Sequence, residues 1–438
     1  MKPPVHEVAG QALDKAIVVS LVLKGDRLSD DRVQHSLDEL IRLADSAGVE
    51  VLHSVVQSKD SIDSKWFIGK GKAEEVRDLA VQLGANTAIF DQELSGAQVR
   101  NLEHALDLKI IDRTQLILDI FAQRAKTREG FLQVELAQLS YLLPRLSGHG
   151  VNLSRLGGGI GTRGPGETKL EMDRRHIRNR ISELRHSLQE VKRHRELHRE
   201  RRKKTGVYQV ALVGYTNAGK STLLNRMTSA DVYAENQLFA TLDPTSRALR
   251  LPSGQEVVLT DTVGFIQNLP HDLVAAFRAT LEEVNEADLI LHVVDSASEM
   301  RERQMAVVDE VLLELGAQGK PRITVFNKID KAADGSGALL SADGDSLKVS
   351  AFSETDLELL KLSIQEKLMG GTKRFLIPAA RGDLISLVYR LGDVLEQEIE
   401  GDDIRFDVRV KQTEFEKQGY MLQAFIAQEA IQLEGESY

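Results

Sequence analysis

Residues 208–222 read YQVALVGYTNAGKST, an apolar run that leads directly into a glycine-rich loop. The run predicts a buried strand, and TLLNRM at 222–227 predicts a helix after the loop. Residues 214–221 satisfy the pattern G-x-x-x-x-G-K-[ST], in which backbone N–H groups turn toward phosphate oxygens. Lys220 is expected to reach the β- and γ-phosphates and the Ser221 hydroxyl to meet Mg²⁺. The segment therefore predicts a nucleoside triphosphate site, with contacts from Gly214, Tyr215, Thr216, Asn217, Ala218, Gly219, Lys220, Ser221 and Thr222.

A second motif, DTVG at 261–264, ends an apolar run about 40 residues after the phosphate loop. We expect Asp261 to hold Mg²⁺ through water at the edge of a strand. The backbone N–H of Gly264 could sense the γ-phosphate, with Thr262 and Val263 completing the turn. An isolated D-x-x-G is more often an ordinary turn. Its order and spacing behind the phosphate loop favour the nucleotide site.

The base is predicted by NKID at 327–330, directly after the apolar run RITVF. The Asp330 carboxylate suits the N1–H and 2-amino donors of guanine, whereas adenine offers an acceptor at N1. Asn327 could tie this loop to the phosphate loop, and Lys328 could lie along the base beside Ile329. A backbone N–H among Ser350, Ala351 and Phe352 could meet the guanine O6. The nucleotide is therefore expected to be GTP or GDP.

The segment AENQLFATLDPTSRAL at 234–249 is expected to be the first switch. A threonine here supplies Mg²⁺ with a second hydroxyl when the γ-phosphate is bound, and spacing alone leaves Thr241 and Thr245 both open. Phe265 stands where many GTPases have a glutamine that orients the attacking water. A phenylalanine cannot do this, so we expect slow intrinsic hydrolysis that depends on a partner or a cation. Around the switch threonine we also expect nucleotide contacts from Phe239, Ala240, Leu242 and Asp243.

Asn217 raises the question of a second cofactor. Its amide oxygen could hold a monovalent cation such as K⁺ near the β–γ bridge, in place of an arginine finger. The alternative is an asparagine that caps the loop through local hydrogen bonds.

The composition of the chain limits its chemistry and its location. The 438 residues contain no cysteine, which excludes disulfides, thiolate metal sites and cysteine nucleophiles. Nowhere do 18 apolar residues follow one another, and residues 1–19 do not read as an export signal. We expect a cytoplasmic protein without a membrane span. Its net charge of -10 argues against nucleic-acid binding by the whole surface.

One segment of the chain is strongly basic, although the net charge of the whole chain is negative. Residues 172–204 contain thirteen Lys/Arg and five Asp/Glu, and they keep apolar residues at helical spacing. Residues 127–146 predict a partner helix, and 147–166 hold eight glycines, so a helical hairpin with a flexible tip is expected. The charges could be a solvated face, or they could contact RNA phosphates. The residues expected at RNA are Arg155, Arg163, Arg174 and Arg175.

Strand and helix patterns alternate from 16 to 126 and again from 207 to 369, which is typical of parallel α/β layers. We expect an α/β fold: an N-terminal α/β domain (1–126), the hairpin (127–205), a P-loop GTPase domain (206–371) and a small α+β C-terminal domain (372–438).

Nearly the whole chain resembles the HflX-type ribosome-associated GTPases, near the Obg group. The resemblance rests on FIGKGKAEEV (67–76), FDQELSGAQVRNLE (90–103), residues 112–146, GTRGPGETKLEMDRR (161–175) and LFATLDPT (238–245). It implies that Thr241 is the switch threonine and that an apolar residue at 265 belongs to the pattern. It further implies binding to ribosomal RNA of the large ribosomal subunit and splitting or rescue of stalled ribosomes. We also expect a monomer off the ribosome.

Two other functions remain open from the sequence. The protein could be a signalling switch that exposes its switch segments to a protein target when it holds GTP. The N-terminal domain could also bind a second nucleotide. However, GKGK at 69–72 lacks the trailing Ser or Thr of a phosphate loop, so it more readily predicts a loop and a helix start.

Overall fold

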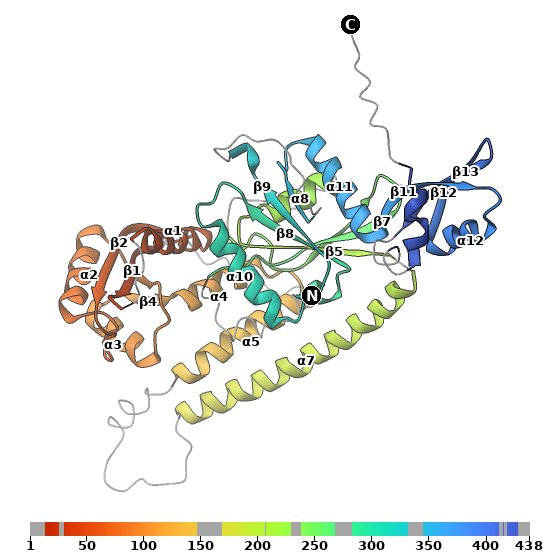
Figure 1. Ribbon diagram of the computed structural model, residues 1–438. Coiled ribbons are helices and arrows are strands. Elements are labelled where there is room, and N and C mark those ends of the chain that lie inside the picture. Colours follow the sequence, from red (N-terminus) through yellow and green to blue (C-terminus); the bar gives the residue numbers. More distant parts are fainter. Residues whose placement is uncertain are drawn as a thin grey trace, which may run out of the picture.

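The computed structural model describes residues 14–25, 30–146, 169–205, 207–228, 238–267, 283–331, 345–410, 415 and 418–427. Within these ranges the strands form three sheets, two of them covered by helices on both faces (Figure 1). The fold is α/β, with a six-stranded central sheet between a four-stranded N-terminal sheet and a three-stranded C-terminal sheet. None of the described helices is both long and apolar enough to cross a membrane.

The N-terminal sheet has four parallel strands in the order β2-β1-β3-β4. Parallel strands are buried on both faces, which explains the continuous apolar run AIVV in the first strand. Helices α1 and α4 cover one face, and α2 and α3 cover the other. The elements are β1 (Lys15–Leu23), α1 (Asp30–Ser46), β2 (Glu50–Lys59), α2 (Lys70–Leu83), β3 (Thr87–Phe90), α3 (Gly96–Leu106), β4 (Lys109–Asp112) and α4 (Arg113–Arg124).

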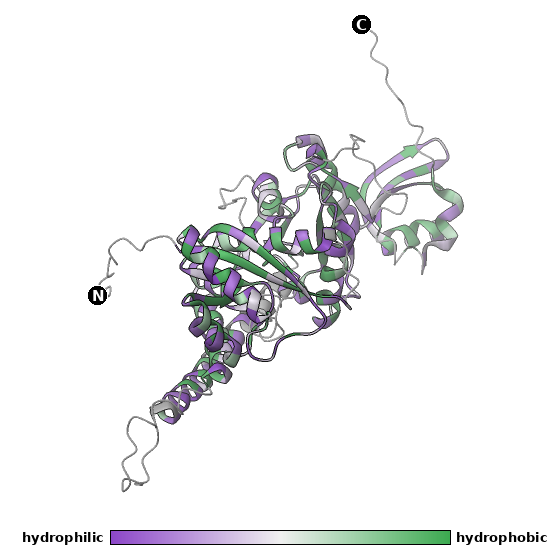
Figure 2. Cartoon of the chain, turned by 90° about the vertical axis from the view of Figure 1, so that its left-hand side faces the viewer, coloured by the Kyte–Doolittle hydropathy of each residue, from purple (hydrophilic) through white to green (hydrophobic). Residues whose placement is uncertain are grey.

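A helical hairpin projects from the body, with α5 (Arg128–Arg145) against α7 (Lys169–Thr205) (Figures 1 and 2). The apolar stripe of α7 is buried at Ile181 and Leu184. Arg180 forms an ion pair with Glu135 of α5 across the hairpin. The predicted hairpin is therefore present. Pro144 lies inside the last turn of α5, and the helix ends one residue later at Arg145. The predicted glycine tip, 147–166, lies outside the described residues.

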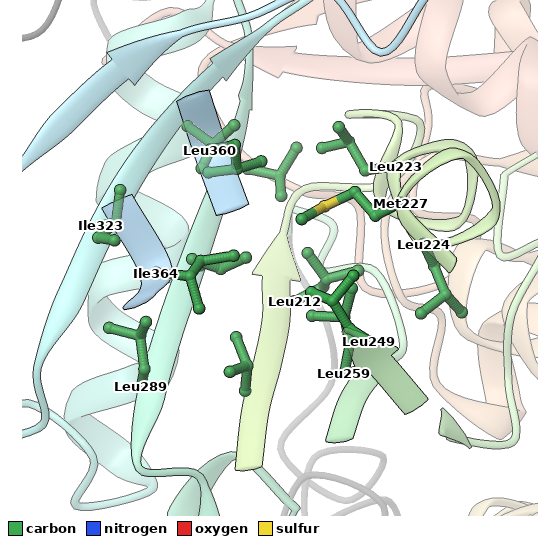
Figure 3. Close-up of a cluster of buried hydrophobic side chains, with 14 of the residues drawn as sticks. Leu212, Leu223, Leu224, Met227, Leu249, Leu259, Leu289, Ile323, Leu360 and Ile364 are labelled. Atoms are coloured by element: carbon green, nitrogen blue, oxygen red, sulfur yellow. The ribbon is translucent and has the colours of Figure 1, made fainter. Parts of the chain in front are cut away.

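The central sheet has six strands in the order β10-β9-β8-β5-β7-β6, all parallel except the edge strand β6. Figure 3 shows its leucine-rich core between the sheet and helices α8 and α11, with Leu212, Leu223 and Leu360 at zero exposure. The elements are β5 (Gln209–Gly214), α8 (Lys220–Thr228), β6 (Thr245–Arg250), β7 (Glu256–Asp261), β8 (Leu289–Asp295), α10 (Arg301–Glu314), β9 (Arg322–Asn327), η1 (Ile329–Lys331), β10 (Ser346–Lys348) and α11 (Glu354–Met369).

The C-terminal part is an antiparallel sheet in the order β11-β13-β12, with one helix packed on it. Phe375, Leu387 and Phe406 belong to an apolar cluster that this part keeps for itself. The elements are β11 (Gly371–Pro378), α12 (Gly382–Leu391), β12 (Gly392–Glu400), β13 (Asp403–Val410) and the 3₁₀ helix η2 (Gly419–Phe425).

The N-terminal sheet and the central sheet share one apolar cluster. Leu40 of α1 and Phe121 of α4 belong to it together with Leu238, Phe239 and Val263 of the central domain. The Phe121 and Phe239 rings meet edge to face, with their centroids 4.7 Å apart. The first switch and the DTVG segment are therefore packed against the N-terminal half.

Candidate nucleotide-binding site

A cavity of about 350 Å³ opens at the carboxyl edge of the central sheet, where ligands bind in doubly wound folds. Five chain segments meet there: the phosphate loop, the first switch, the DTVG turn, the NKID loop and the loop after β10. The lining residues are Thr216, Asn217, Gly219, Lys220, Ser221, Thr222, Phe239, Ala240, Thr241, Thr262, Gly264, Asn327, Lys328, Asp330, Lys331, Ala351 and Phe352.

The phosphate loop joins β5 to α8 in a conformation that suits its sequence. Asn217 and Gly219 have φ values of 60° and 96°, which asparagine and glycine tolerate best. Lys220 curls over the loop and donates to the carbonyls of Gly214 and Tyr215 at 3.1 and 2.9 Å. Burial lowers the pKa of Lys220 to about 8. The ammonium is thus held by two loop carbonyls. A phosphate bound beside it would favour its charged form.

Three oxygen groups converge beside the phosphate loop. The Asp261 Oδ2 atom accepts from the Ser221 and Thr241 hydroxyls at 2.6 and 2.7 Å, and the two hydroxyls are 2.9 Å apart. The Asp261 Oδ1 atom is buried without a hydrogen-bond partner, and burial raises the pKa of this carboxyl. Mg²⁺ takes hard oxygen ligands of this kind, so the residues fit that ion. Thr245, the alternative from spacing, instead donates to the Asp243 carbonyl at 3.4 Å.

Two side chains tie the NKID loop to the phosphate loop, and of these the sequence predicted Asn327. Asn327 Nδ2 donates to the Ala218 carbonyl at 2.9 Å, and Lys328 Nζ donates to the Asn217 carbonyl at 2.6 Å. Lys328 also pairs at 2.8 Å with Asp295, at the end of β8, which the sequence analysis did not single out. Its place at the carboxyl end of an apolar strand was the available signal.

The exposed carboxylate of Asp330 accepts from the Ser350 hydroxyl at 2.7 Å. The backbone N–H groups around Ser350 differ in availability. The Ser350 N–H donates to the Asp356 carboxylate, and the Phe352 N–H donates to the Ser350 hydroxyl. Among the described residues no partner is found for the Ala351 N–H. It is therefore the group best placed to meet an acceptor on a base.

Some residues expected at the nucleotide do not turn their side chains to the cavity. Leu242 and Val263 are buried in the shared apolar cluster. The Asp243 carboxylate accepts from the backbone N–H groups of Lys126 and Thr127 at 2.8 and 2.9 Å, at the start of α5. The expected residues that do not line the cavity are Gly214, Tyr215, Ala218, Leu242, Asp243, Asp261, Val263, Ile329 and Ser350.

Phe265 is 1% exposed and packs in an apolar cluster with Val213 and Ile290, facing away from the cavity. Its backbone is held by the phosphate loop instead. The Thr216 N–H donates to the Phe265 carbonyl at 2.7 Å, and the Phe265 N–H donates to the Gly214 carbonyl at 3.1 Å. A Cβ on Gly264 would lie 2.9 Å from the Thr216 Cα, so only glycine fits this contact.

Of the residues expected at RNA, Arg174 and Arg175 do not line this cavity. Arg155 and Arg163 fall outside the described residues. Arg174 is partly buried and Arg175 exposed on α7, in the projecting hairpin.

A phosphate loop, two convergent hydroxyls beside a carboxylate and an NKID loop on one sheet edge define a P-loop GTPase. A model of the GTP-binding GTPase N-terminal region matches residues 34–122. A model of the GTP-binding GTPase middle region matches 124–202, and a model of 50S ribosome-binding GTPases matches 209–328.

Known proteins resemble the chain over most of its length. GTPase HflX of Caldanaerobacter subterraneus subsp. tengcongensis is 50% identical over 399 residues, 91% of this chain and 91% of that protein. GTPase HflX of Escherichia coli K12 is 50% identical over 321 residues, 73% of this chain and 74% of that protein. A GTP-binding protein from the archaeon Sulfolobus solfataricus, in complex with GDP, has a TM-score of 0.44 at 25% identity, covering 81% of this chain and 99% of that one. The chain belongs to the HflX family of GTPases, and it is a GTP phosphohydrolase.

Proposed function

We propose that this GTPase binds the large ribosomal subunit through its helical hairpin and uses GTP binding and hydrolysis to split or rescue stalled ribosomes. The observation that carries the proposal is the position of the basic stretch. Arg178, Arg185 and Arg193 are exposed on α7, on a hairpin that extends away from the GTP site. Phosphate contacts along such a helix would add affinity without occupying the catalytic cavity. The match to 50S ribosome-binding GTPases supports this partner.

The same proposal divides the chain into the N-terminal domain (1–126), the hairpin (127–205), the GTPase domain (206–371) and the C-terminal domain (372–438). The separate sheets and the isolated C-terminal cluster support it. Such a protein would work in the cytoplasm, as a monomer when off the ribosome.

At the GTP site, we assign Ser221 and Thr241 as the residues that hold Mg²⁺ directly and Asp261 as the one that holds it through water. When bound, this ion would neutralise charge on the β- and γ-phosphates. Lys220 would move from the loop carbonyls to the phosphates, and the Gly264 N–H would face the γ-phosphate. Asp330 and the Ala351 N–H would select guanine.

The magnesium assignment is tested by comparing Thr241→Ala with Thr245→Ala. The first should raise the Mg²⁺ concentration needed for half-maximal hydrolysis and lower the rate at least tenfold. The second should leave both within twofold. Equal effects of the two changes would refute the assignment.

Hydrolysis without a partner should be slow. Phe265 stands where other GTPases have a glutamine that orients the attacking water, and its side chain is buried in apolar surroundings. A monovalent cation at Asn217 is the candidate for partial compensation. Its side-chain amide forms no hydrogen bond among the described residues, so local capping of the loop gains no support. GTP turnover should be faster in K⁺ than in Na⁺, and Asn217→Ala should abolish the difference.

The ribosome proposal is tested by co-sedimentation with isolated large subunits in GDP, GTP and a non-hydrolysable analogue. Binding should be strongest with the analogue, and the subunits should raise the hydrolysis rate by at least tenfold. Splitting of intact ribosomes should require GTP or the analogue. Deletion of residues 148–164 should abolish splitting and leave GTP affinity unchanged.

A charge-reversal pair separates the hairpin from general charge effects. Arg178→Glu with Arg185→Glu should weaken binding to the large subunit at least tenfold. Arg301→Glu with Arg390→Glu makes the same change of charge at exposed positions outside the hairpin and should leave binding within twofold. If the ribosome changes neither sedimentation nor hydrolysis, the alternative of a GTP-dependent switch acting on a protein target takes its place.

A further inference from the structure

Tyr215 belongs to the phosphate loop by sequence, yet its side chain enters the N-terminal domain. Its hydroxyl donates to Glu39 Oε1 of α1. The same hydroxyl oxygen accepts from the backbone N–H of Gln267 at 2.9 Å. Tyr215 is 5% exposed. A single buried hydroxyl therefore joins the phosphate loop, the chain after the DTVG turn and the N-terminal domain.

Glu39 is itself fixed by a buried guanidinium. Arg113, at the start of α4, is 3% exposed and donates to Glu39 Oε2 and, at 2.7 Å, to Asp91 Oδ1. The Ser36 hydroxyl completes the chain by donating to Asp91 Oδ2 at 2.8 Å. Two carboxylates share one guanidinium, so Glu39 needs the further donor that Tyr215 supplies. Burial and the neighbouring Glu39 raise the pKa of Tyr215, which keeps the hydroxyl protonated as that donor.

The network lies at the carboxyl ends of β3 and β4, next to the point where the strand order of the N-terminal sheet reverses. In doubly wound sheets this crevice is the usual place for a ligand. Here Arg113 and the phosphate-loop Tyr215 both donate to Glu39. The N-terminal domain thus contacts the GTPase domain through a side chain of the phosphate loop.

The contact bears on the position of Gly264. Three residues after this glycine, the Gln267 N–H is held by the Tyr215 hydroxyl, and between them the Phe265 backbone is bonded to the phosphate loop on both sides. The segment that delivers the Gly264 N–H to the cavity is therefore fixed relative to the phosphate loop. Errors of about 1 Å in such placement cost about a hundredfold in rate.

We propose that Tyr215 is a positioning residue for GTP hydrolysis, and that Glu39 and Arg113 of the N-terminal domain hold its hydroxyl in place. The catalytic geometry of the GTPase domain is then completed by the N-terminal domain. A movement of that domain changes the hydrolysis rate through this hydroxyl, without any new group entering the cavity.

The test is steady-state GTP hydrolysis by the full chain with Tyr215→Phe. The ring keeps its packing in the shared cluster, whereas the Gln267 N–H and Glu39 lose their common partner. We expect kcat to fall about tenfold and KM for GTP to stay within twofold. Tyr141→Phe is the matched control, because it removes a hydroxyl from a partly buried tyrosine of α5 whose hydroxyl lies at Asp112 of the N-terminal domain and not at the phosphate loop. It should leave kcat unchanged.

A double-mutant cycle separates positioning from loss of packing. Glu39→Gln should lower kcat like Tyr215→Phe, and the two together should lower it no further than either alone. Thermal unfolding of each variant shows whether it is folded at the assay temperature. If Tyr215→Phe lowers only the melting temperature, with kcat unchanged, or if the two effects on kcat multiply, the proposal is wrong.

Discussion

At the scale of the residue, burial decides which side chains can act at the GTP site. Phe265 follows the DTVG turn directly, but its ring lies among Val213, Ile290 and Val308 in the interior. Only its backbone takes part, through hydrogen bonds to the phosphate loop. The position therefore serves the packing of the domain, and its side chain has no path to an attacking water.

Phe265→Gln is expected not to accelerate hydrolysis, although it restores the residue common in other GTPases. The amide would be buried without a partner, and with the lost apolar contacts this should destabilise the domain by about 3 kcal/mol. Thermal unfolding and GTP turnover check the two halves of the prediction. Phe265→Leu is the control, with a smaller loss of stability and an unchanged rate. A tenfold faster Phe265→Gln enzyme would show that the side chain can reach the cavity.

His292 on β8 offers a pH-dependent test of the core. It is 1% exposed, and burial followed by the charge of Arg322 lowers its pKa to about 4. An unfolded histidine has a pKa near 6.5, so below that pH the unfolded chain binds a proton that the folded chain refuses. The free energy of unfolding should fall as pH drops from 6.5 toward 4, by about 3 kcal/mol in total.

The measurement compares thermal unfolding of the wild type and His292→Gln between pH 7.5 and 5. The variant should lose less stability over this range, because it has no group to titrate at that position. Equal pH dependence of the two proteins would mean that His292 is not the group responsible.

Residue contacts inside the GTPase domain could largely be predicted from sequence, whereas those made with the N-terminal half could not. The tie from Asn327 to the phosphate loop follows from motifs whose geometry is fixed by the nucleotide they bind. Tyr215 and Glu39 are 176 residues apart in the chain, and their contact depends on how the two sheets pack against each other. No local pattern encodes that pairing. Asp243 was expected at the nucleotide because it follows Thr241, and its contact with α5 has the same long-range origin.

At the scale of the element, the start of α5 is joined to the first switch. Thr127 caps the helix by accepting from the Gly130 N–H at 2.9 Å, and Asp243 accepts from the Thr127 hydroxyl and from two backbone N–H groups. A carboxylate at a helix N-terminus is also favoured by the helix dipole. The segment that carries Thr241 therefore stabilises the first helix of the hairpin.

Asp243→Ala should loosen the start of α5, since the Lys126 and Thr127 N–H groups lose their acceptor. We expect faster hydrogen exchange at these amides and a loss of about 1–2 kcal/mol in stability. Thr245→Ala, in the same segment, removes only a hydroxyl that donates to the Asp243 carbonyl, and it should leave the exchange unchanged. An unaltered exchange rate in Asp243→Ala would mean that the switch does not hold the helix.

The elements themselves were predicted well because their periodicity is strong. The apolar stripe of α7 at Ile181 and Leu184 predicted the hairpin, and both residues are buried. The helix predicted over 127–146 is observed as Arg128–Arg145, with Pro144 in its last turn, where a proline removes only one hydrogen bond and the turn survives it. The order of strands in the sheets was beyond the sequence, since it depends on pairings between distant segments.

At the scale of the whole molecule, the apolar clusters divide the chain differently from its sheets. Phe121 of the N-terminal half and Phe239 of the GTPase domain share one cluster, and the network of Arg113, Glu39 and Tyr215 crosses the same boundary. The C-terminal sheet keeps a cluster of its own around Phe406. Two cooperative units are expected: the N-terminal half with the GTPase domain, and the C-terminal sheet.

GDP should therefore stabilise the first unit and not the second. At 100 times its dissociation constant, GDP adds about 2.7 kcal/mol to the unit that binds it. Hydrogen exchange should slow in α1 and α4, which do not line the GTP cavity, and stay unchanged in β11 and β13. The protection of α1 should vanish in a variant whose contact is broken, such as Glu39→Gln with Phe121→Ala. If GDP protects the GTPase domain alone, the two sheets unfold independently, and the shared cluster transmits no stability between them.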